Sequence, residues 1–288
     1  MGKGASTVIS GQTYNAAADI GPLAMLRSMW VHRGLIARLT GRELAGRYRG
    51  SMLGMVWAVL TPLMMLGVYT FVFRTVFKAR WTAEGPGAGN GEFALLLFAG
   101  LILFNVFSET VNRAPGLMLE NVSYIKKVVF PLEIMPAVAL AGAVCNAGIG
   151  FAVLALFYGP VFGAPPWTAL LIPLMLPSLA LLTLGLSWFL ASVGVFLRDL
   201  RQFIGVAVTM LMFLSPIFYP ASAIPEELRP LLVFNPLTSI LEQGRNLLFW
   251  GVTPDWGAWL GMLVFSYAVA WLGYAWFVKT RKGFADVV

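Results

Sequence analysis

Long apolar segments alternate with short polar ones along most of the chain. A membrane-spanning helix needs about 20 mostly apolar residues, and six segments meet or approach that length. The fourth contains Pro173 and Pro177 and is longer than a bilayer requires, which predicts a kinked or tilted helix, whereas the fifth is short and stops at Pro216. The pattern therefore predicts an all-α integral membrane protein with six transmembrane helices, at residues 52–77, 93–113, 134–158, 167–196, 203–219 and 256–278.

Composition agrees with a bilayer environment and excludes a water-soluble domain. Of the 288 residues, 59% are hydrophobic and 11% are charged, against roughly 45–50% and 25% in soluble domains. The single cysteine, Cys145, and the single histidine, His32, exclude an internal disulfide and a cysteine- or histidine-rich metal site. The predicted spans also lack paired carboxylates suited to acid–base catalysis. We therefore expect a protein that is not an enzyme and binds no metal or cofactor itself.

The distribution of charge predicts the orientation in the membrane. The formal net charge is +7, but the basic residues flank apolar spans, so anionic lipids and topology explain them better than nucleic acid does. Residues 1–22 lack the apolar core of a secretory signal and form a flexible tail that starts in the cytoplasm. Six spans then place both termini in the cytoplasm, with fifteen of the twenty lysines and arginines on that side. The five basic residues left on the outer side are Arg74, Lys78, Arg80, Arg229 and Arg245. Four tryptophans flank the predicted outer ends: Trp81, Trp167, Trp256 and Trp259.

Residues 23–49 precede the transmembrane domain, which we assign to residues 50–282. Leu23, Leu26 and Trp30 recur at helical spacing among arginines, which favours an amphipathic helix lying along the inner membrane surface. A cytoplasmic flank that only sets topology would explain the charges but not the apolar periodicity.

Glycines recur every fourth residue where this helix meets the first span. Gly46, Gly50 and Gly54 would form a smooth strip on which another helix can pack closely. Arg47 and Arg49 lie beside that strip, where guanidinium groups can bind a lipid phosphate. They can also be ordinary topology signals, and the sequence leaves both interpretations open.

The second span carries one polar face. Asn105, Ser108, Glu109 and Asn112 follow the spacing i, i+3, i+4 and i+7, so they share one side of an otherwise apolar helix. Such a face lines a water-accessible path or binds neighbouring helices through hydrogen bonds. The ionisable Glu109 favours a path or a subunit contact.

Two further segments do not fit a simple bundle. Residues 114–131 are bounded by prolines and predict a short cytoplasmic helix that docks a soluble partner, or else a loop on the membrane surface. Residues 220–255 contain two apolar stretches, each too short to span, around Asn235 and Pro236. They predict a re-entrant hairpin at the outer mouth of a path, with two helices lying flat outside the bilayer as the alternative.

Several local strings follow one another along the chain in a characteristic order. They are Arg47-Tyr48-Arg49-Gly50-Ser51, Leu53-Gly54, Trp57, Pro62-Leu63, Val68-Tyr69-Thr70-Phe71-Val72-Phe73, Pro216-Ile217-Phe218-Tyr219-Pro220 and Phe234-Asn235-Pro236-Leu237. In this order they resemble the membrane subunits of ABC transporters that export bacterial O-antigen, capsule and teichoic-acid polymers, and the similarity runs from about residue 38 to 282.

This resemblance implies a homodimer in the bacterial cytoplasmic membrane that carries a lipid-linked polysaccharide. It implies an interface helix at residues 23–45, a coupling helix at 115–128 and an outer gate at 225–250. It also implies a separate cytoplasmic ATP-binding subunit that uses ATP and Mg²⁺, and the chain itself has no G-x-x-x-x-G-K-[ST] loop for ATP phosphates. The coupling candidates are Glu120, Tyr124, Lys126 and Lys127, and the outer-gate candidates are Tyr219, Phe234, Asn235 and Pro236.

Aromatic rings offer faces on which sugars can slide without binding in one register. Besides Arg47, Arg49 and the polar face of the second span, the substrate-path candidates are therefore Tyr69, Phe71 and Phe73, and the wider aromatic set adds Phe77, Phe104 and Phe107. The alternative function is an ABC exporter permease for a drug or a small lipid.

Overall fold

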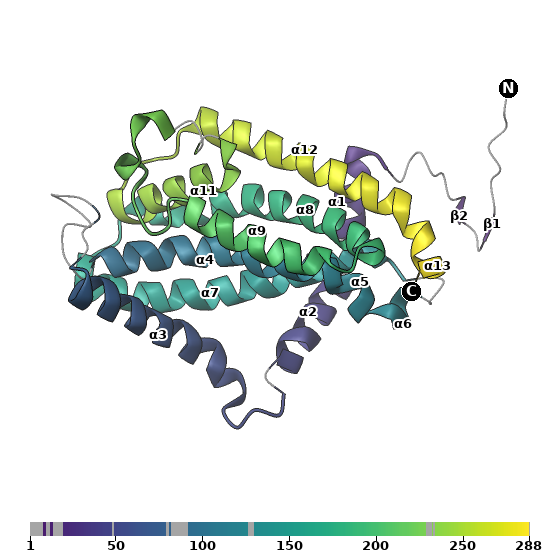
Figure 1. Ribbon diagram of the computed structural model, residues 1–288, viewed down its shortest axis with the longest axis horizontal. Coiled ribbons are helices and arrows are strands. Elements are labelled where there is room, and N and C mark those ends of the chain that lie inside the picture. Colours follow the sequence, from purple (N-terminus) through teal and green to yellow (C-terminus); the bar gives the residue numbers. More distant parts are fainter. Residues whose placement is uncertain are drawn as a thin grey trace.

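The computed structural model is almost entirely helical (Figure 1). It describes residues 8–9, 12–13, 20–47, 49–78, 81, 92–125, 130–228, 232 and 234–287. The strands of this described part are two-residue segments, β1 (Val8–Ile9) and β2 (Gln12–Thr13), which pair antiparallel. The predicted all-α membrane fold is confirmed.

Five helical segments of the described chain are long and apolar enough to cross a membrane, and they match five predicted spans. They contain α3 (Trp57–Tyr69), α4 (Glu92–Arg113), α7 (Met135–Phe162), α8 (Leu176–Phe196) and α12 (Trp256–Thr280).

The fifth predicted span is shorter in the structure than the sequence pattern suggested. Its helix, α9 (Leu200–Leu214), has 15 residues, about 22 Å at the rise of an α-helix, against a hydrocarbon core of about 30 Å. Residues 215–219 are not helical, so the predicted end at residue 219 is wrong. Pro216 lacks the N–H group that a continuing helix needs. The number of six spans stays a prediction.

The fourth span changes helix type near its prolines. Trp167–Met175 is a 3-10 helix that contains Pro173, and α8 follows with Pro177 in its first turn. The predicted irregularity is therefore a change from 3-10 to α geometry. Pro177 lies in the first turn of α8, where an N–H group would have no partner within the helix, so proline costs no hydrogen bond there.

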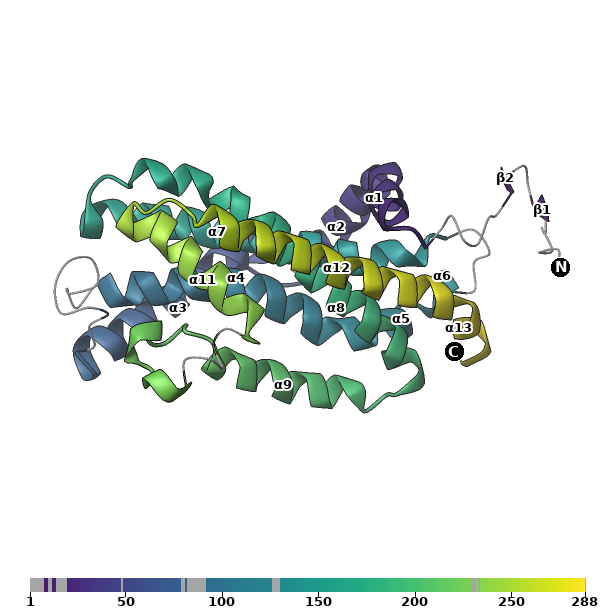
Figure 2. The same cartoon turned by 90° about the horizontal axis from the view of Figure 1, so that it is seen from above.

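Helix α4 is the centre of the bundle. Sixteen of its 22 residues are buried, and it packs against α7, α8, α9 and α11 (Pro236–Arg245). Figures 1 and 2 show α4, α7, α8, α9 and α12 running along the long axis, with α11 near one end and α13 (Phe284–Val287) at the other. We call these the α11 end and the α13 end.

Helix α3 differs from the rest of the bundle because it is hardly covered. Leu66 is its one buried residue. Figure 1 shows α3 meeting the bundle near the α11 end and diverging from it towards α2. A π-helical segment, Thr70–Val76, continues α3.

The N-terminal helix predicted at residues 23–49 is two helices, α1 (Pro22–Val31) and α2 (Arg33–Arg47). The chain turns at His32, whose N–H donates to Ser28 O. Leu23 and Trp30 are exposed, whereas Met25 is buried. The exposed apolar side chains are available to a membrane surface, and that placement stays a prediction.

The glycine strip predicted for close helix packing is wrong. The helix ends at Arg47, before Gly50 and Gly54, which have φ values of +87° and +51°. These left-handed conformations, which glycine adopts without steric cost, turn the chain from α2 into α3. Close packing occurs instead between α8 and α12, where a Cβ at Gly273 would lie 2.0 Å from Gly185 O.

The single helix predicted at residues 114–131 is also wrong. A 3-10 turn, Ala114–Gly116, leads into the one-turn helices α5 (Leu117–Glu120) and α6 (Val122–Ile125). Asn121 interrupts them, and its side-chain amide donates to Leu117 O at 2.9 Å. Lys126 and Lys127 lie outside the described residues.

The second limb of the predicted re-entrant hairpin is α11 and a π-helical turn, Asn246–Trp250. Leu237, Ile240 and Leu241 bury α11 in the core, and the helix contacts α4, α8 and α12. A helix lying flat outside the bilayer would not be buried in this way, so the structure argues against that alternative for α11. The first limb contains short 3-10 turns, Ala221–Ala223 and Glu226–Leu228, and includes residues that the structure does not describe. The hairpin as a whole stays a prediction.

Candidate functional site

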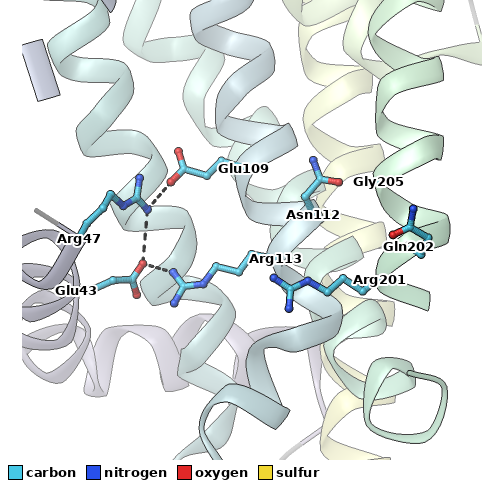
Figure 3. Close-up of a pocket in the computed structure, with 8 residues that line it drawn as sticks. All are labelled: Glu43, Arg47, Glu109, Asn112, Arg113, Arg201, Gln202 and Gly205. Atoms are coloured by element: carbon cyan, nitrogen blue, oxygen red, sulfur yellow. Dashed lines mark hydrogen bonds and ion pairs between the residues drawn. The ribbon is translucent and has the colours of Figure 1, made fainter. Parts of the chain in front are cut away.

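A charged pocket of about 730 Å³ lies near the α13 end of the bundle, between α2, α4 and α9. Figure 3 shows its side chains converging from these three helices. Its lining residues are Glu43, Arg47, Glu109, Asn112, Arg113, Arg201, Gln202 and Gly205.

Arg47 joins α2 to the polar face of α4. It is the last residue of α2, where a cation interacts favourably with the helix dipole. Its Nη2 lies 2.5 Å from Glu109 Oε1 and 3.9 Å from Glu43 Oε1. The side chains of Arg47 and Glu109 are 32% and 31% exposed, so a solute in the pocket can reach this ion pair.

A second series of ion pairs continues from α2 towards α9. Glu43 accepts a hydrogen bond from Arg113, and Arg113 Nε lies 3.6 Å from Glu120 Oε2. Glu120 Oε1 in turn lies 3.6 Å from Arg201 Nη1. Charges of alternating sign therefore connect α2, α4, α5 and α9, although each exposed pair contributes only about 0–1 kcal/mol.

The polar face predicted for the second span faces this region. Asn146 on α7 donates to Glu109 at 3.2 Å, and Asn112 donates to Ser108 at 3.2 Å. Asn105 is exposed. Glu109 thus binds neighbouring helices, whereas Asn112 and Ser108 bond to each other within α4, and all four side chains border a pocket.

A second pocket, of about 360 Å³, shares Arg47 and Glu109 with the first. It lies between α3, α4 and α7, and its α4 residues extend from Glu109 to Phe98, about 16 Å along a helix. Pro62 of α3 also lines it. Because Pro62 has no N–H, the carbonyl of Ala58 beside it lacks its helical donor. The charged pocket therefore continues into a groove that becomes more apolar towards the α11 end.

The aromatic residues predicted to line the path lie in different environments in the structure. Tyr69 lines the groove, Phe73 stacks on Phe93 at 5.0 Å between ring centroids, and Phe71 is exposed in the π-helical segment that follows α3. From the wider set, Phe104 and Phe107 are buried in the core. The π-helical geometry after Tyr69 widens the turn, which changes the directions of the following side chains.

Arg47 and Arg49 also lie in different environments. Arg49 lies in the exposed turn after α2 and lines neither of these pockets. Of the two arginines proposed for phosphate binding, Arg47 is therefore the one that the structure places at the pocket.

The coupling candidates connect to the same network. Glu120 contacts Arg113 and Arg201, as described above, and Tyr124 accepts a hydrogen bond from Arg42 of α2. The Tyr124 ring stacks on Phe130 at 4.3 Å. The α5–α6 segment is thus attached to both α2 and α9.

The outer-gate candidates lie where α9 ends and α11 begins. Asn235 caps α11 by accepting from Leu237 N at 3.0 Å, and its amide donates to Ser215 Oγ at 2.8 Å. Pro236 occupies the first turn of α11, a position where its fixed φ suits a helix. Tyr219 donates to Phe213 O at 2.9 Å, whereas Phe234 is 84% exposed.

One residue that the sequence placed only among the outer basic residues is Arg245. It is 3% exposed, and Trp81, expected at a membrane interface, is buried against it. The sequence did contain a signal for a buried donor at this place. Pro216 and Pro220 are four residues apart, so Pro216 O has no N–H at residue 220 to accept from.

Within the described residues, no group of three histidine, cysteine, aspartate or glutamate side chains is placed to hold a metal ion. Three arginines and two glutamates line the charged pocket, a combination suited to an anionic solute rather than to a cation.

The fold and pockets define a multi-span membrane protein, and comparison with known proteins identifies its class. A family described as "ABC-2 type transporter" matches residues 35–249, most of the chain. The chain belongs to the ABC-2 type transporter family.

The chain is similar along nearly its whole length to several named members. One is the O-antigen export system permease protein RfbA of Myxococcus xanthus, 27% identical over 269 residues that cover 92% of this chain and 100% of the relative. The protein of the same name from Klebsiella pneumoniae is 27% identical over 259 residues, or 88% and 95% of the two chains. The polysialic acid transport protein KpsM of Escherichia coli is 23% identical over the same shares.

Proposed function

We propose that this chain is the channel-forming subunit of an ATP-driven exporter that moves a lipid-linked polysaccharide across the cytoplasmic membrane. The observation that carries the proposal is the similarity, over 92% of this chain and all of the relative, to a permease named for O-antigen export. O-antigen is therefore the first substrate to test, with capsule and teichoic-acid polymers in the same class.

The charged pocket supports recognition of the phosphate that joins such a polymer to its lipid. Phosphate and carboxylate both accept two hydrogen bonds from a guanidinium group. A substrate phosphate that enters the pocket can therefore replace Glu109 or Glu43 as the partner of Arg47. The groove along α4 then offers polar groups and the Tyr69 ring to the sugars that follow.

The partner that hydrolyses ATP is proposed to dock at the α5–α6 segment, including Glu120, Tyr124, Lys126 and Lys127. Glu120 and Tyr124 support this location because their contacts to Arg201 and Arg42 connect the segment with α9 and α2. Movement of a docked subunit would reach the charged pocket through these contacts.

The proposed assembly is a homodimer with both termini in the cytoplasm. Helix α3 supports a second copy because it leaves large apolar side chains exposed along one side of the pocket. Two copies placed with these sides together would enclose the groove. The outer gate is then assigned to the α11 end, with Tyr219, Phe234, Asn235 and Pro236.

Deletion of the gene from its host tests the transported compound. We expect polysaccharide to disappear from the cell surface and its lipid-linked form to accumulate inside the cell, and both changes to reverse when the gene is restored. Normal surface polysaccharide, together with sensitivity to a drug or a lost surface lipid, would instead support the alternative function.

Purification with and without the ATP-binding subunit tests whether ATP hydrolysis depends on that subunit. We expect ATP hydrolysis only in the assembled complex, because the chain has no phosphate-binding loop. Cysteine crosslinking from position 123, an exposed residue of α6, should reach the ATP-binding subunit. Crosslinking only from a control position such as exposed Leu170 on the 3-10 helix would contradict the docking site.

A further inference from the structure

Arg245 is held in a socket at the α11 end, formed by Trp81, Leu96, Gly100, Pro216 and Ile217. Its Nε donates to Leu96 O at 3.1 Å and its Nη2 to Ile217 O at 3.0 Å, while Nη1 donates to Pro216 O. Its guanidinium carbon lies 4.4 Å from the centre of the Trp81 ring. One planar cation therefore joins α11, the first half of α4 and the segment that follows α9.

Two of these carbonyls need a donor because of the sequence after α9. In a continuing helix, Pro216 O would accept from the N–H of residue 220, but residue 220 is also proline. Pro216 and Ile217 are buried and lie outside the helix. Buried carbonyls without hydrogen-bond partners are costly, and they cost more where the protein lies in a bilayer. Arg245 supplies the missing donors.

The socket also depends on a glycine of α4. A Cβ at Gly100 would lie 2.3 Å from Arg245 Nη2 and 3.0 Å from its Cζ. Both distances are shorter than a van der Waals contact, so alanine at this position would displace the guanidinium group. Gly148 of α7 provides a contrast, because a Cβ there meets nothing within 4 Å.

The position of α9 depends on such contacts at its ends. This helix buries only Ile204 and Val208 along its length. At the α13 end Arg201 contacts Glu120. At the α11 end the chain after the helix is bound by Asn235, which donates to Ser215, and by Arg245.

We propose that Arg245 is a positioning residue that holds the end of α9 against α4 and α11 and so keeps the α11 end of the protein closed at rest. Three coplanar donors fix both distance and orientation, which a single hydrogen bond does not. Movement of α9 in the transport cycle then requires the socket to open. This inference does not depend on which compound is transported, and its test does not measure export.

The experiment uses the full chain assembled with its ATP-binding subunit in lipid nanodiscs and in vesicles, without nucleotide. Cys145→Ser removes the native thiol, and spin labels are attached at exposed Leu214 of α9 and Leu170 of the 3-10 helix. Electron–electron double resonance gives the distance distribution between them, and release of a small trapped dye from vesicles measures leakage.

Arg245→Met and Gly100→Ala should both broaden the distance distribution and raise dye leakage. We expect roughly a tenfold shift towards the open form, because hydrogen bonds from a charged donor are lost. Arg245→Lys should give an intermediate value, since an ammonium group keeps the charge but not the planar set of donors. Gly148→Ala is the matched control and should behave like the parent.

A purely structural role would lower thermal stability without altering the distance distribution of the assembled protein. Parental distance and leakage in Arg245→Met would overturn the proposal, as would equal changes in Gly148→Ala. If Arg245→Met fails to insert, the distance distributions and leakage of Gly100→Ala and Arg245→Lys test the proposal instead, because both variants retain the buried cation. Unchanged distance and leakage in Arg245→Met would leave the proposed function standing, because gene deletion tests that function separately.

Discussion

The two ends of the bundle hold arginines in different ways. At the α13 end the side chains of Arg47, Arg113 and Arg201 are 30–66% exposed and face glutamates across an open pocket. At the α11 end Arg245 is 3% exposed and donates to backbone carbonyls. The arginines at the α13 end can exchange their glutamate partners for an anionic solute. Arg245 at the α11 end is bound to backbone carbonyls, which a solute cannot replace.

This contrast follows from solvent access. Exposed ion pairs are screened by salt over about 8 Å at physiological ionic strength and contribute about 0–1 kcal/mol each. Removing a buried donor instead leaves its acceptors without water or protein partners, which costs more. The structure thus combines a charged site suited to reversible binding with a fixed arginine that orders the backbone.

The largest expected effect is on stability. Arg245→Met should destabilise the protein by about 3 kcal/mol, because three buried hydrogen bonds are lost, whereas Arg113→Met should cost less than about 1 kcal/mol. Thermal unfolding of the purified variants in one detergent measures the difference. Equal midpoints for the two variants would contradict the comparison between the ends.

The next effect concerns binding at the charged pocket. Arg47→Lys should reduce substrate-stimulated ATP hydrolysis of the assembled complex roughly tenfold, because lysine cannot form the bidentate contact to phosphate. Arg49→Lys is the matched control, since Arg49 lies in the exposed turn outside both pockets. Normal stimulation in Arg47→Lys would leave Arg47 as an orientation signal, for which lysine serves equally well.

A smaller effect is expected where the α5–α6 segment meets α9. Glu120→Gln keeps the shape of the side chain but removes the charge between Arg113 and Arg201. Export should fall about fivefold while insertion stays normal, as expected for the loss of about 1 kcal/mol of exposed ion pairing. Glu227→Gln, at an exposed site beyond α9, is the control, and an equal loss there would remove the special role of Glu120.

The smallest effect is the response to salt. Raising the salt concentration to about 0.5 M shortens the screening length, so amide hydrogen exchange in the last turn of α2 should accelerate by a factor of about two. Exchange in α11 should change less, because Arg245 is buried and its hydrogen bonds go to backbone carbonyls. Mass spectrometry of peptides from both helices measures this, and parallel acceleration would show that the two ends respond alike.

Much of the fold was readable from the sequence because a bilayer leaves few alternatives. An apolar run of about 20 residues must satisfy its own backbone, so five predicted spans match the structure closely. The polar face of α4 was equally readable, since the helical repeat alone places Asn105, Ser108 and Glu109 on one side.

Local patterns failed where the chain stops being regular. Gly46, Gly50 and Gly54 have helical spacing, but the helix ends at Arg47 and two of these glycines adopt positive φ values. Residues 114–125 have the length of one helix, yet the helix is interrupted at Asn121, whose side-chain amide donates to Leu117 O. Spacing predicts a shared face only while the backbone keeps its helical geometry.

The sequence by itself determined where the long apolar helices lie and that the second span has a polar side. Tertiary structure decided which charges meet. Arg245 and Leu96 are 149 positions apart, and Arg47 meets Glu109 from another helix. Hydropathy counts every arginine alike, but burial and partners arise only when distant segments pack together. That is why Arg245, counted with the outer basic residues, is buried among carbonyls while Arg47 and Glu109 border an open pocket.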